Sequence, residues 1–200
     1  MGVKVTEVPK LVIEGITDPT TIVCISRSRK FSQYKKAIAD ALGGVCPFCQ
    51  IDWTYNDLIT ENAHWYAWHS NPPEKNTMHH FLYVPKRHIL DTNELINAEV
   101  LALWGENGIR HQVRKRFQAS SCGTMIRDGD ATMGAGTVQH LHVHDMVPDG
   151  RGRVESPIYK GLESDIESVR RAVVFEKLRQ DWERTDLTPE ELELINGRLD

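Results

Sequence analysis

The alternation of apolar and polar side chains predicts strands in the middle of the chain. Residues 63–69 and 79–84 are rich in aromatic and branched side chains and are bounded by Asn and Pro, as strands commonly are. Two further strands are expected over 123–127 and 138–147, separated by a loop rich in Gly and Asp. We expect each of these two pairs of strands to lie side by side.

Helical patterns flank the strands. Residues 29–42 suit a helix that ends at the two glycines after it, and the first 25 residues are expected to be strands or an extended arm. Between 93 and 117 the apolar residues only partly keep a helical spacing, and Gly105 and Gly108 weaken the middle. We therefore expect a helix there, either continuous or broken at these glycines.

After Pro148 the composition shifts to Gly and Arg, and the pattern then becomes helical. From about residue 161 to about residue 184, apolar side chains recur near every 3.6 residues. They are Leu162, Ile166, Val169, Val173, Leu178 and Trp182. Such a stripe must be covered, either by the core or by the same helix of a partner subunit. A last helix is predicted to begin after Thr188. Thr188 would be its N-cap, Pro189 its first residue and Glu191 its third.

Composition and charge bound the class of protein. The chain has 200 residues, is 40% hydrophobic and 26% charged, and has a formal net charge of -4, as one globular domain with appended helices would. This charge gives no general attraction to a nucleic-acid backbone. No stretch has the roughly 20 apolar residues that cross a bilayer, and no secretory signal is found. We expect a cytoplasmic protein that binds neither extended nucleic acid nor membrane.

Three histidines alternate with aliphatic residues in the segment 140–144. This alternation has the period of a strand, so His140, His142 and His144 are expected to project from one face while the residues between them point into a core. The alternatives are a metal site or three incidental histidines on an exposed strand. Because imidazole titrates near pH 6.5, one ring can act as a nucleophile while a neighbour donates a proton. This arrangement suits phosphoryl or nucleotidyl transfer through a covalent phosphoramidate.

Two other segments add candidate chemistry. Residues 134–137, Gly-Ala-Gly-Thr, directly precede the histidines, and such a run lets backbone amides approach a phosphate. Cysteines occur at 24, 46, 49 and 122, and the middle pair is spaced Cys-Pro-Phe-Cys. In a reducing compartment this pair indicates a metal site or a redox motif before a structural disulfide. A thiol redox protein is disfavoured, because the sequence around the pair lacks the strand and helix of a redox fold.

Three motifs resemble the histidine-triad family. Residues 134–144, Gly-Ala-Gly-Thr-Val-Gln-His-Leu-His-Val-His, resemble its signature, and residues 83–89 resemble its strand-ending Pro-Lys-Arg-His motif. Residues 46–49 resemble the Cys-x-Phe-Cys that opens many bacterial members. The resemblance covers 46–148 and leaves both ends of the chain unmatched.

The resemblance implies roles for individual residues. His142 corresponds to the family's nucleophile, His144 would assist the leaving group, and His140 would orient the site or bind metal. Gly134, Gly136, Thr137 and Arg127 are the expected nucleotide and phosphate contacts. The third histidine stands where the galactose-1-phosphate uridylyltransferase branch has Gln, which favours hydrolysis or phosphorolysis over hexose transfer.

Two departures from the family pattern bear on these roles. Asp145 follows the third histidine where the family usually has an apolar residue, so the strand would end or bulge early, or the carboxylate would tune His144. Where many members have Asn-Glu-Gly, this chain has Arg127-Asp-Gly-Asp, and Arg127 is expected to bind phosphate or to pair with a carboxylate.

Zinc-containing relatives imply a metal site at Cys46, Cys49, His88 and His140. Two thiolates and two imidazoles are typical of structural Zn²⁺. His79 and His80 are possible substitutes for His88, and a pair of thiols without metal is the alternative.

These observations together predict an α+β fold with an antiparallel sheet of about five strands, packed helices, and further helices at both ends. Residues 1–45 would form an N-terminal extension, 46–154 the catalytic domain and 155–200 a C-terminal helical extension. The expected activity is hydrolysis or transfer at the α-phosphate of dinucleoside polyphosphates or nucleoside phosphoramidates, with no organic cofactor and no catalytic metal required. The resemblance implies a homodimer. The alternative function is that of a regulatory module that binds nucleotides, has a structural zinc site and catalyses no turnover. Asp145, as a departure from the family pattern, is the residue that favours this alternative.

Overall fold

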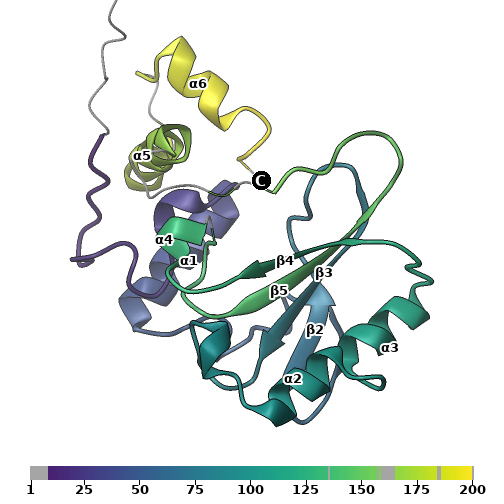
Figure 1. Ribbon diagram of the computed structural model, residues 1–200. Helices are drawn as coiled ribbons and strands as arrows, with labels where there is room; N and C mark the ends of the chain where they lie inside the picture. Colours follow the sequence, from purple (N-terminus) through teal and green to yellow (C-terminus); the bar gives the residue numbers. More distant parts are fainter. Residues whose placement is uncertain (1–8, 135, 157, 159–164, 184–185, 200) are drawn as a thin grey trace, which may run out of the picture. The chain divides into compact units, whose positions relative to one another are not determined.

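A computed structural model of the chain describes residues 9–134, 136–156, 158, 165–183 and 186–199. The chain divides into two compact units (Figure 1). We call residues 47–130 and 140–158 the sheet unit. Residues 1–46, 131–139 and 159–200 form what we call the helical unit. None of the described helices is long and apolar enough to cross a membrane.

The sheet unit contains a five-stranded antiparallel sheet with the strand order β1-β2-β3-β5-β4. Its strands are β1 (Leu58–Glu61), β2 (Trp65–His69), β3 (Thr77–Pro85), β4 (Gly123–Arg127) and β5 (His142–Pro148). The predicted α+β fold is thus confirmed, and β4 has the predicted bounds. The last strand begins four residues later than the alternation indicated, because the segment before His142 belongs to other hydrogen-bond networks.

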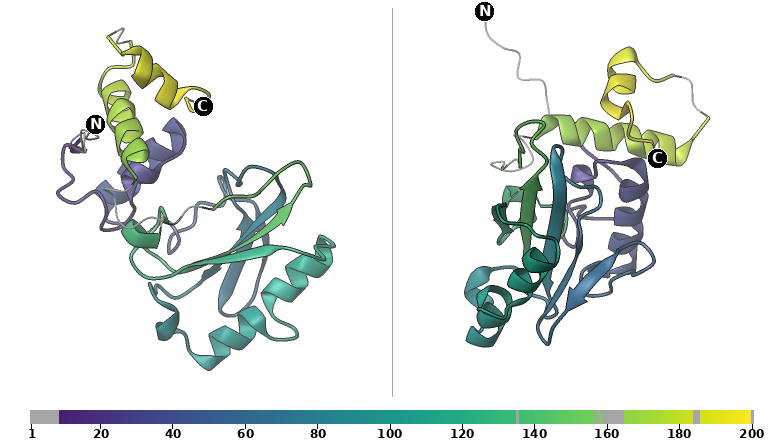
Figure 2. Two further views of the ribbon diagram at one scale, coloured as in Figure 1. Left: turned by 45° about the horizontal axis from the view of Figure 1, so that its top comes forward. Right: turned by 90° about the vertical axis from the view of Figure 1, so that its right-hand side faces the viewer.

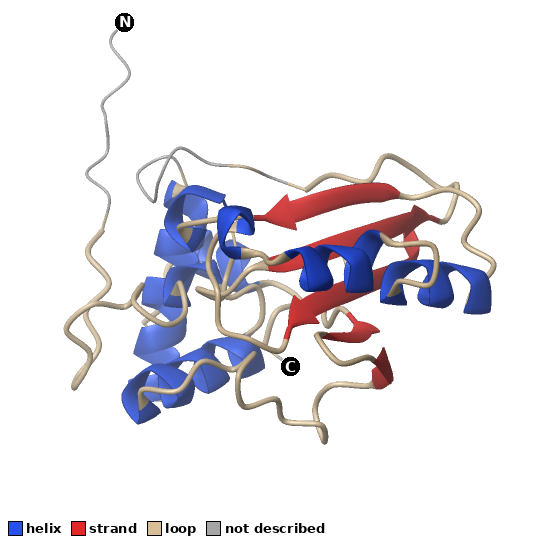
Figure 3. Cartoon of the chain, turned by 60° about the horizontal axis from the view of Figure 1, so that its bottom comes forward, coloured by secondary structure: helices blue, strands red, loops and turns tan. Residues whose placement is uncertain are grey.

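Helices α2 (Asn97–Trp104) and α3 (Ile109–Arg116) cover one face of the sheet (Figures 1 and 3). Of the two forms left open for the helix across this region, the structure has the one broken at the two glycines. A Cβ at Gly105 or at Gly108 would lie 2.5 Å from a backbone carbonyl oxygen, so only glycine fits the break. The short 3₁₀ helix η2 (Thr92–Glu94) precedes α2.

The core between this face and the two helices is formed by large side chains. Its fully buried members include Trp65, Phe81, Tyr83, Ile109, Val113 and Leu141. Each such side chain stabilises the fold by about 1.5–3 kcal/mol relative to an exposed position. The histidine-bearing strand is therefore held on a well-packed support.

The helical unit brings together segments that are distant in the sequence. Its elements are η1 (Ile25–Arg27), α1 (Phe31–Gly43), α4 (Ala131–Gly134), α5 (Ile166–Gln180) and α6 (Pro189–Ile195). Figure 2 shows α5 in green alongside the purple α1. The helix α1 ends at Gly44, which has φ +66°, and α6 begins with the predicted cap, in which the Thr188 hydroxyl accepts from the Glu191 amide at 3.2 Å.

Leu178 of the predicted apolar stripe is buried in a core that α5 shares with η1, α1 and α6. Phe175 is fully buried against Phe31 and Tyr34, with ring centroids 5.6 Å apart in each case. The sequence prediction placed Val173 and Trp182 in the stripe, but Val173 is only half-buried and Trp182 lies beyond the end of α5. Leu162 lies outside the described residues. The buried side chains of α5 pack within the helical unit, and the contact with a partner subunit stays a prediction.

Candidate active site and metal cluster

The strand β5 places two of the three histidines on the sheet face opposite α2 and α3. His142 and His144 alternate with Val143, which points into the core beneath the helices. His140 precedes the strand, and the amide of the intervening Leu141 donates to the Ile89 carbonyl at 2.7 Å. The expected alternation therefore holds for the residues of β5, while His140 is positioned by the preceding loop.

The ring of His142 has a defined tautomer. Its Nδ1 lies 2.6 Å from the backbone carbonyl oxygen of His140, which can only accept, so Nδ1 carries the proton. Its Nε2 therefore keeps a lone pair. The side chain is 5% exposed, which is more enclosed than the sequence pattern indicated.

A fourth histidine fixes the ring of His144. The backbone amide of Glu74 donates to Nδ1 of His80 at 2.9 Å, and Nε2 of His80 lies 2.8 Å from Nδ1 of His144. Because Nδ1 of His80 accepts, its Nε2 carries the proton and donates to His144. In a neutral His144 the proton then sits on Nε2. The sequence indicates His80 only as a possible metal ligand. Its contact with His144 follows from strand pairing, because His80 lies on β3 opposite Met146 and therefore on the triad face.

Burial keeps the first two triad histidines neutral at neutral pH. The pKa of His142 is lowered to about 3, chiefly by desolvation and also by the charge of Arg127, while the hydrogen bond to the His140 carbonyl opposes the shift. Desolvation also lowers the pKa of His140 to about 4. A neutral His142 with a lone pair on Nε2 is the form that can act as a nucleophile.

Aromatic side chains border the triad. Phe48 and His142 pack edge to face with ring centroids 5.3 Å apart, and the ring of Phe48 also packs against His140 and Trp68. The ring centroid of Trp68 is in turn 5.9 Å from that of the half-exposed Trp53. These rings form a small apolar cluster on the triad face.

The four predicted metal ligands lie together. The ligand atoms of Cys46, Cys49, His88 and His140 are all within 4.8 Å of one another, and the group could bind a metal ion. The sulfur of Cys49 is 3.2 Å from Nδ1 of His88 and 3.6 Å from Nδ1 of His140. Tetrahedral zinc with Zn–S of about 2.3 Å and Zn–N of about 2.05 Å separates sulfur and nitrogen by about 3.6 Å, so the donor set fits that ion.

A second contact orients His140 for this cluster. Its Nε2 lies 3.1 Å from the Pro85 carbonyl oxygen and donates to it, which leaves Nδ1 facing Cys49. His79, one of the two proposed substitutes for His88, packs instead against Phe81 and Phe117.

The remaining predicted contacts are distributed over both units. Arg127 is 8% exposed, pairs in register with His142, and donates to the Ser156 hydroxyl at 2.9 Å. Gly134 ends α4, Gly136 is buried and Thr137 is half-buried, and these three belong to the helical unit.

Asp145 does not act as either sequence interpretation proposed. The strand neither ends nor bulges there but continues to Pro148, so the side chain points to the opposite face from His144. Asp145 is fully buried, 2.8 Å from the guanidinium of Arg110, and accepts from the Thr124 hydroxyl at 2.7 Å. This departure from the family pattern is a core ion pair.

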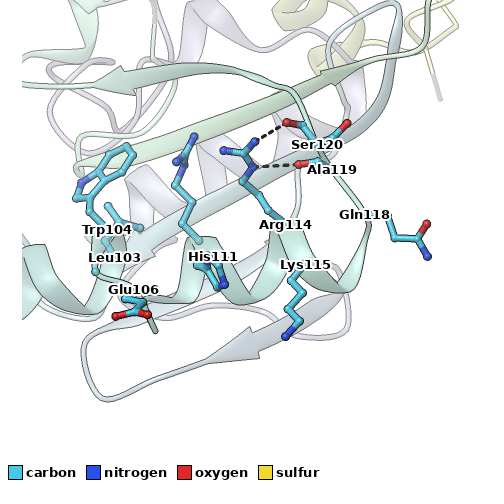
Figure 4. A pocket seen from close by; sticks show the side chains of 11 residues that line it. Leu103, Trp104, Glu106, His111, Arg114, Lys115, Gln118, Ala119 and Ser120 are labelled. Carbon is cyan, nitrogen blue, oxygen red and sulfur yellow. Dashed lines mark hydrogen bonds between the residues drawn. The ribbon is translucent and has the colours of Figure 1, made fainter.

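A hollow of about 510 Å³ lies beside α3, away from the triad (Figure 4). Arg114 reaches across it and donates to the carbonyl oxygens of Ala119 and Ser120, at 3.2 Å in each case. None of the triad histidines lines it. The guanidinium of Arg114 therefore satisfies backbone carbonyl groups after the end of α3, as cations near helix C-termini commonly do.

Residues 54–150 match the family model of the HIT domain. A zinc-bound histidine-triad protein from Mycobacterium smegmatis is 20% identical, with a TM-score of 0.41, over 68% of this chain and 96% of that one. A HIT-family protein from Bacillus subtilis is 20% identical, with a TM-score of 0.43, over 75% and 91%. The diadenosine triphosphate hydrolase of Plasmodium falciparum is 17% identical, with a TM-score of 0.38, over 63% and 78%. The search of curated proteins gives no match.

The match to this domain supports a protein of the nucleotide-binding hydrolase and transferase kind. Residues 54–150, which include the His-x-His-x-His segment of residues 140–144, are a HIT domain, the domain of the histidine-triad family.

Proposed function

We propose that the protein hydrolyses dinucleoside polyphosphates or nucleoside phosphoramidates through a covalent nucleotidyl group on His142. The observation that carries this proposal is the hydrogen bond from Nδ1 of His142 to the His140 carbonyl. It leaves the Nε2 lone pair for attack and stabilises the positive charge that the ring gains when Nε2 bonds to phosphorus.

The reaction has two displacements. Nε2 of His142 bonds to the α-phosphorus, and the bond from phosphorus to the leaving oxygen or nitrogen breaks. The Nε2–H of His144 donates a hydrogen bond to the leaving group, which departs as a phosphate anion or, from a phosphoramidate, takes its proton from solvent. Water then attacks the same phosphorus, its proton passes to solvent, and the bond to Nε2 of His142 breaks to release a nucleoside monophosphate.

Four residues are proposed to bind the phosphates. The backbone around Gly134 and Gly136 can approach a non-bridging oxygen closely, and the hydroxyl of Thr137 adds one donor. Arg127, in register with His142, supplies a positive charge. Charge that develops in the transition state is thus met by amides and cations, so this scheme requires no catalytic metal.

We propose that the metal of the cluster is a structural zinc ion held by Cys46, Cys49, His88 and His140. Bound there, it would cross-link three separate segments. Its effect on the reaction would pass through His140, whose carbonyl accepts the proton of His142. A homodimer and a cytoplasmic location stay predictions from the sequence, and light scattering of the purified protein tests the first.

The decisive experiment is incubation of the purified protein with diadenosine triphosphate, diadenosine tetraphosphate and adenosine phosphoramidate. We expect AMP in each successful case, and acid-free quenching followed by peptide mass spectrometry should place an adenylyl group on His142. Binding of these nucleotides without any product would favour the regulatory module instead. An adduct on another residue would refute the assignment of the nucleophile.

A further inference from the structure

The segment 131–139 belongs to the helical unit although it carries the proposed phosphate loop. Its C-terminal end is tied to the N-terminal part of the chain by backbone hydrogen bonds. The amide of Cys24 donates to the Thr137 carbonyl at 2.6 Å, and the amide of Gln139 donates to the Ile22 carbonyl at 3.0 Å. Gln139 is bonded directly to His140, the first histidine of the triad.

The beginning of the same segment is held by one buried side chain. The guanidinium of Arg27 donates through Nη1 to the Ala131 carbonyl and, at 2.7 Å, through Nη2 to the Thr132 carbonyl. Its Nε pairs with the carboxylate of Asp165 at 3.2 Å. Arg27 and Asp165 are 5% and 4% exposed.

These contacts use the special geometry of arginine. A planar guanidinium has five donors in a rigid fork, so it can hold two successive carbonyl oxygens and a carboxylate at once, which an ammonium group cannot do in the same plane. Because a peptide unit is planar and trans, fixing the carbonyl of Ala131 also fixes the amide of Thr132. The first turn of the segment is thereby fixed in direction.

The two partners come from opposite ends of the chain. Arg27 lies in η1, and Asp165 directly precedes α5, so both stand outside the matched HIT domain of residues 54–150. A buried, charged guanidinium is tolerated only where a counter-charge and acceptors satisfy it. The carboxylate therefore keeps Arg27 in place, and Arg27 in turn holds the loop.

We propose that the Arg27–Asp165 pair positions the phosphate loop, so that turnover depends on segments outside the HIT domain. This inference rests on the proposed function. Arg27 is a positioning residue, because it acts through the backbone of residues 131 and 132. The glycines and Thr137 lie between two anchored ends, at Arg27 and at Cys24.

The test separates positioning from simple stability. Arg27→Met leaves the Asp165 carboxylate buried without its guanidinium, so it should lower both the melting temperature and kcat/KM. The double variant Arg27→Met, Asp165→Leu replaces the ion pair with apolar side chains, which commonly restores stability. We expect its melting temperature to recover, whereas kcat/KM for diadenosine tetraphosphate should stay lower than the parent's by about ten- to a hundredfold.

A control variant and hydrogen–deuterium exchange distinguish a local effect on the loop from a general loss of stability. Tyr34→Phe removes a buried hydrogen bond to Glu176 in the same unit without touching the segment 131–139, and its kcat/KM should equal the parent's. Hydrogen–deuterium exchange of residues 131–139 should rise in the double variant and not in Tyr34→Phe. Arg27→Lys keeps the positive charge but loses the forked set of donors. Its kcat/KM should therefore lie between that of the parent and that of the double variant.

Three outcomes would overturn the inference. Recovery of kcat/KM together with the melting temperature in the double variant would reduce the pair to a structural role. Unchanged exchange in residues 131–139 would show that Arg27 does not hold the loop. If the parent binds AMP without turning over any nucleotide, the proposed function fails, and the inference is then decided by AMP affinity: an affinity equal to the parent's in the double variant would refute it.

Discussion

The triad face of the sheet unit and the helical unit use buried polar groups in opposite ways. On the triad face the buried groups are imidazoles, and His142 keeps a lone pair because its other nitrogen donates to a backbone carbonyl. In the helical unit they are charged pairs such as Arg27–Asp165, which hold backbone in place. Neutral, oriented rings suit bond-making chemistry, whereas paired charges suit positioning.

The buried histidines and the buried ion pair also differ in how far apart their residues lie in the sequence. The histidines of β5 are neighbours along the chain, and β3 adds His80 by strand pairing. Arg27 and Asp165, by contrast, are 138 residues apart. We infer that the reactive groups are encoded locally and the support around the phosphate loop is encoded by distant segments.

The largest effect is expected from loss of the nucleophile. His142→Ala removes the only nitrogen proposed to bond to phosphorus, so AMP release should fall by about 10⁴-fold or more, with an unchanged circular dichroism spectrum. The matched control is His111→Ala, an exposed histidine of α3. Retention of most activity in His142→Ala would break the assignment of chemistry to the triad face.

A large effect on stability is expected in the helical unit. Phe175→Ala removes a fully buried ring that packs on Phe31 and Tyr34, and should cost about 3–5 kcal/mol of unfolding free energy. Val173→Ala, two residues away on α5, should cost less than about 1 kcal/mol, because Val173 is only half-buried. Urea unfolding measures both, and equal costs would contradict the packing of α5 on α1.

Removal of the fourth histidine should slow turnover without abolishing it. His80→Ala deletes the donor that orients His144, so kcat should fall by about a hundredfold, within the range that general acid–base groups contribute. The neighbouring variant His79→Ala provides the control, since His79 packs on Phe81 at the opposite face. Rates that fall equally in both variants would argue against a specific role for His80.

A smaller effect on turnover is expected from the metal cluster. The parent should copurify with about one zinc per chain, and Cys49→Ser should lose it, because a set of four ligands tolerates the loss of a thiolate poorly. The rate should then fall by about tenfold through displacement of His140. Elemental analysis that finds no metal in carefully prepared parent protein would refute the zinc proposal.

Motifs and periodicity predicted the parts of the molecule in which neighbours in sequence are neighbours in space. The strand 123–127 and the cap at Thr188 were predicted correctly because each depends on local backbone geometry. The two glycines that weaken the helical pattern lie where α2 ends and before α3 begins, although the sequence left open whether the helix breaks. The metal ligands could be grouped only because the family resemblance supplied long-range information that spacing alone does not contain.

The failures share one physical cause. Whether Asp145 faces the triad or the core depends on the continuation of β5 to Pro148 and on a partner, Arg110, that lies 35 residues away. The buried side chains of α5 likewise pack in part against η1 and α1, from the far end of the chain. No local pattern announces such contacts, because tertiary packing determines them.

The smallest expected effect is a pH dependence of stability in the sheet unit. Desolvation lowers the pKa of His69 below its ordinary value of 6.5, and the neighbouring His79 lowers it further. Arg116 also lowers it, while Asp57 opposes the shift. The unfolded chain therefore binds a proton near pH 6 that the folded chain does not.

The sign of this effect follows from proton linkage. The contribution of a neutral His69 is fully present above about pH 6.5 and is lost as the pH falls from there toward the lowered pKa of the folded state. The variant His69→Leu should remove this part of the loss, so its melting temperature should fall less than the parent's between about pH 7.5 and about pH 5.5. His111→Leu, at an exposed position on α3, should behave like the parent. If His69→Leu loses as much stability on acidification as the parent, then the acid sensitivity of the sheet unit must come from other groups, and the ring of His69 contributes no more to it than an exposed histidine does.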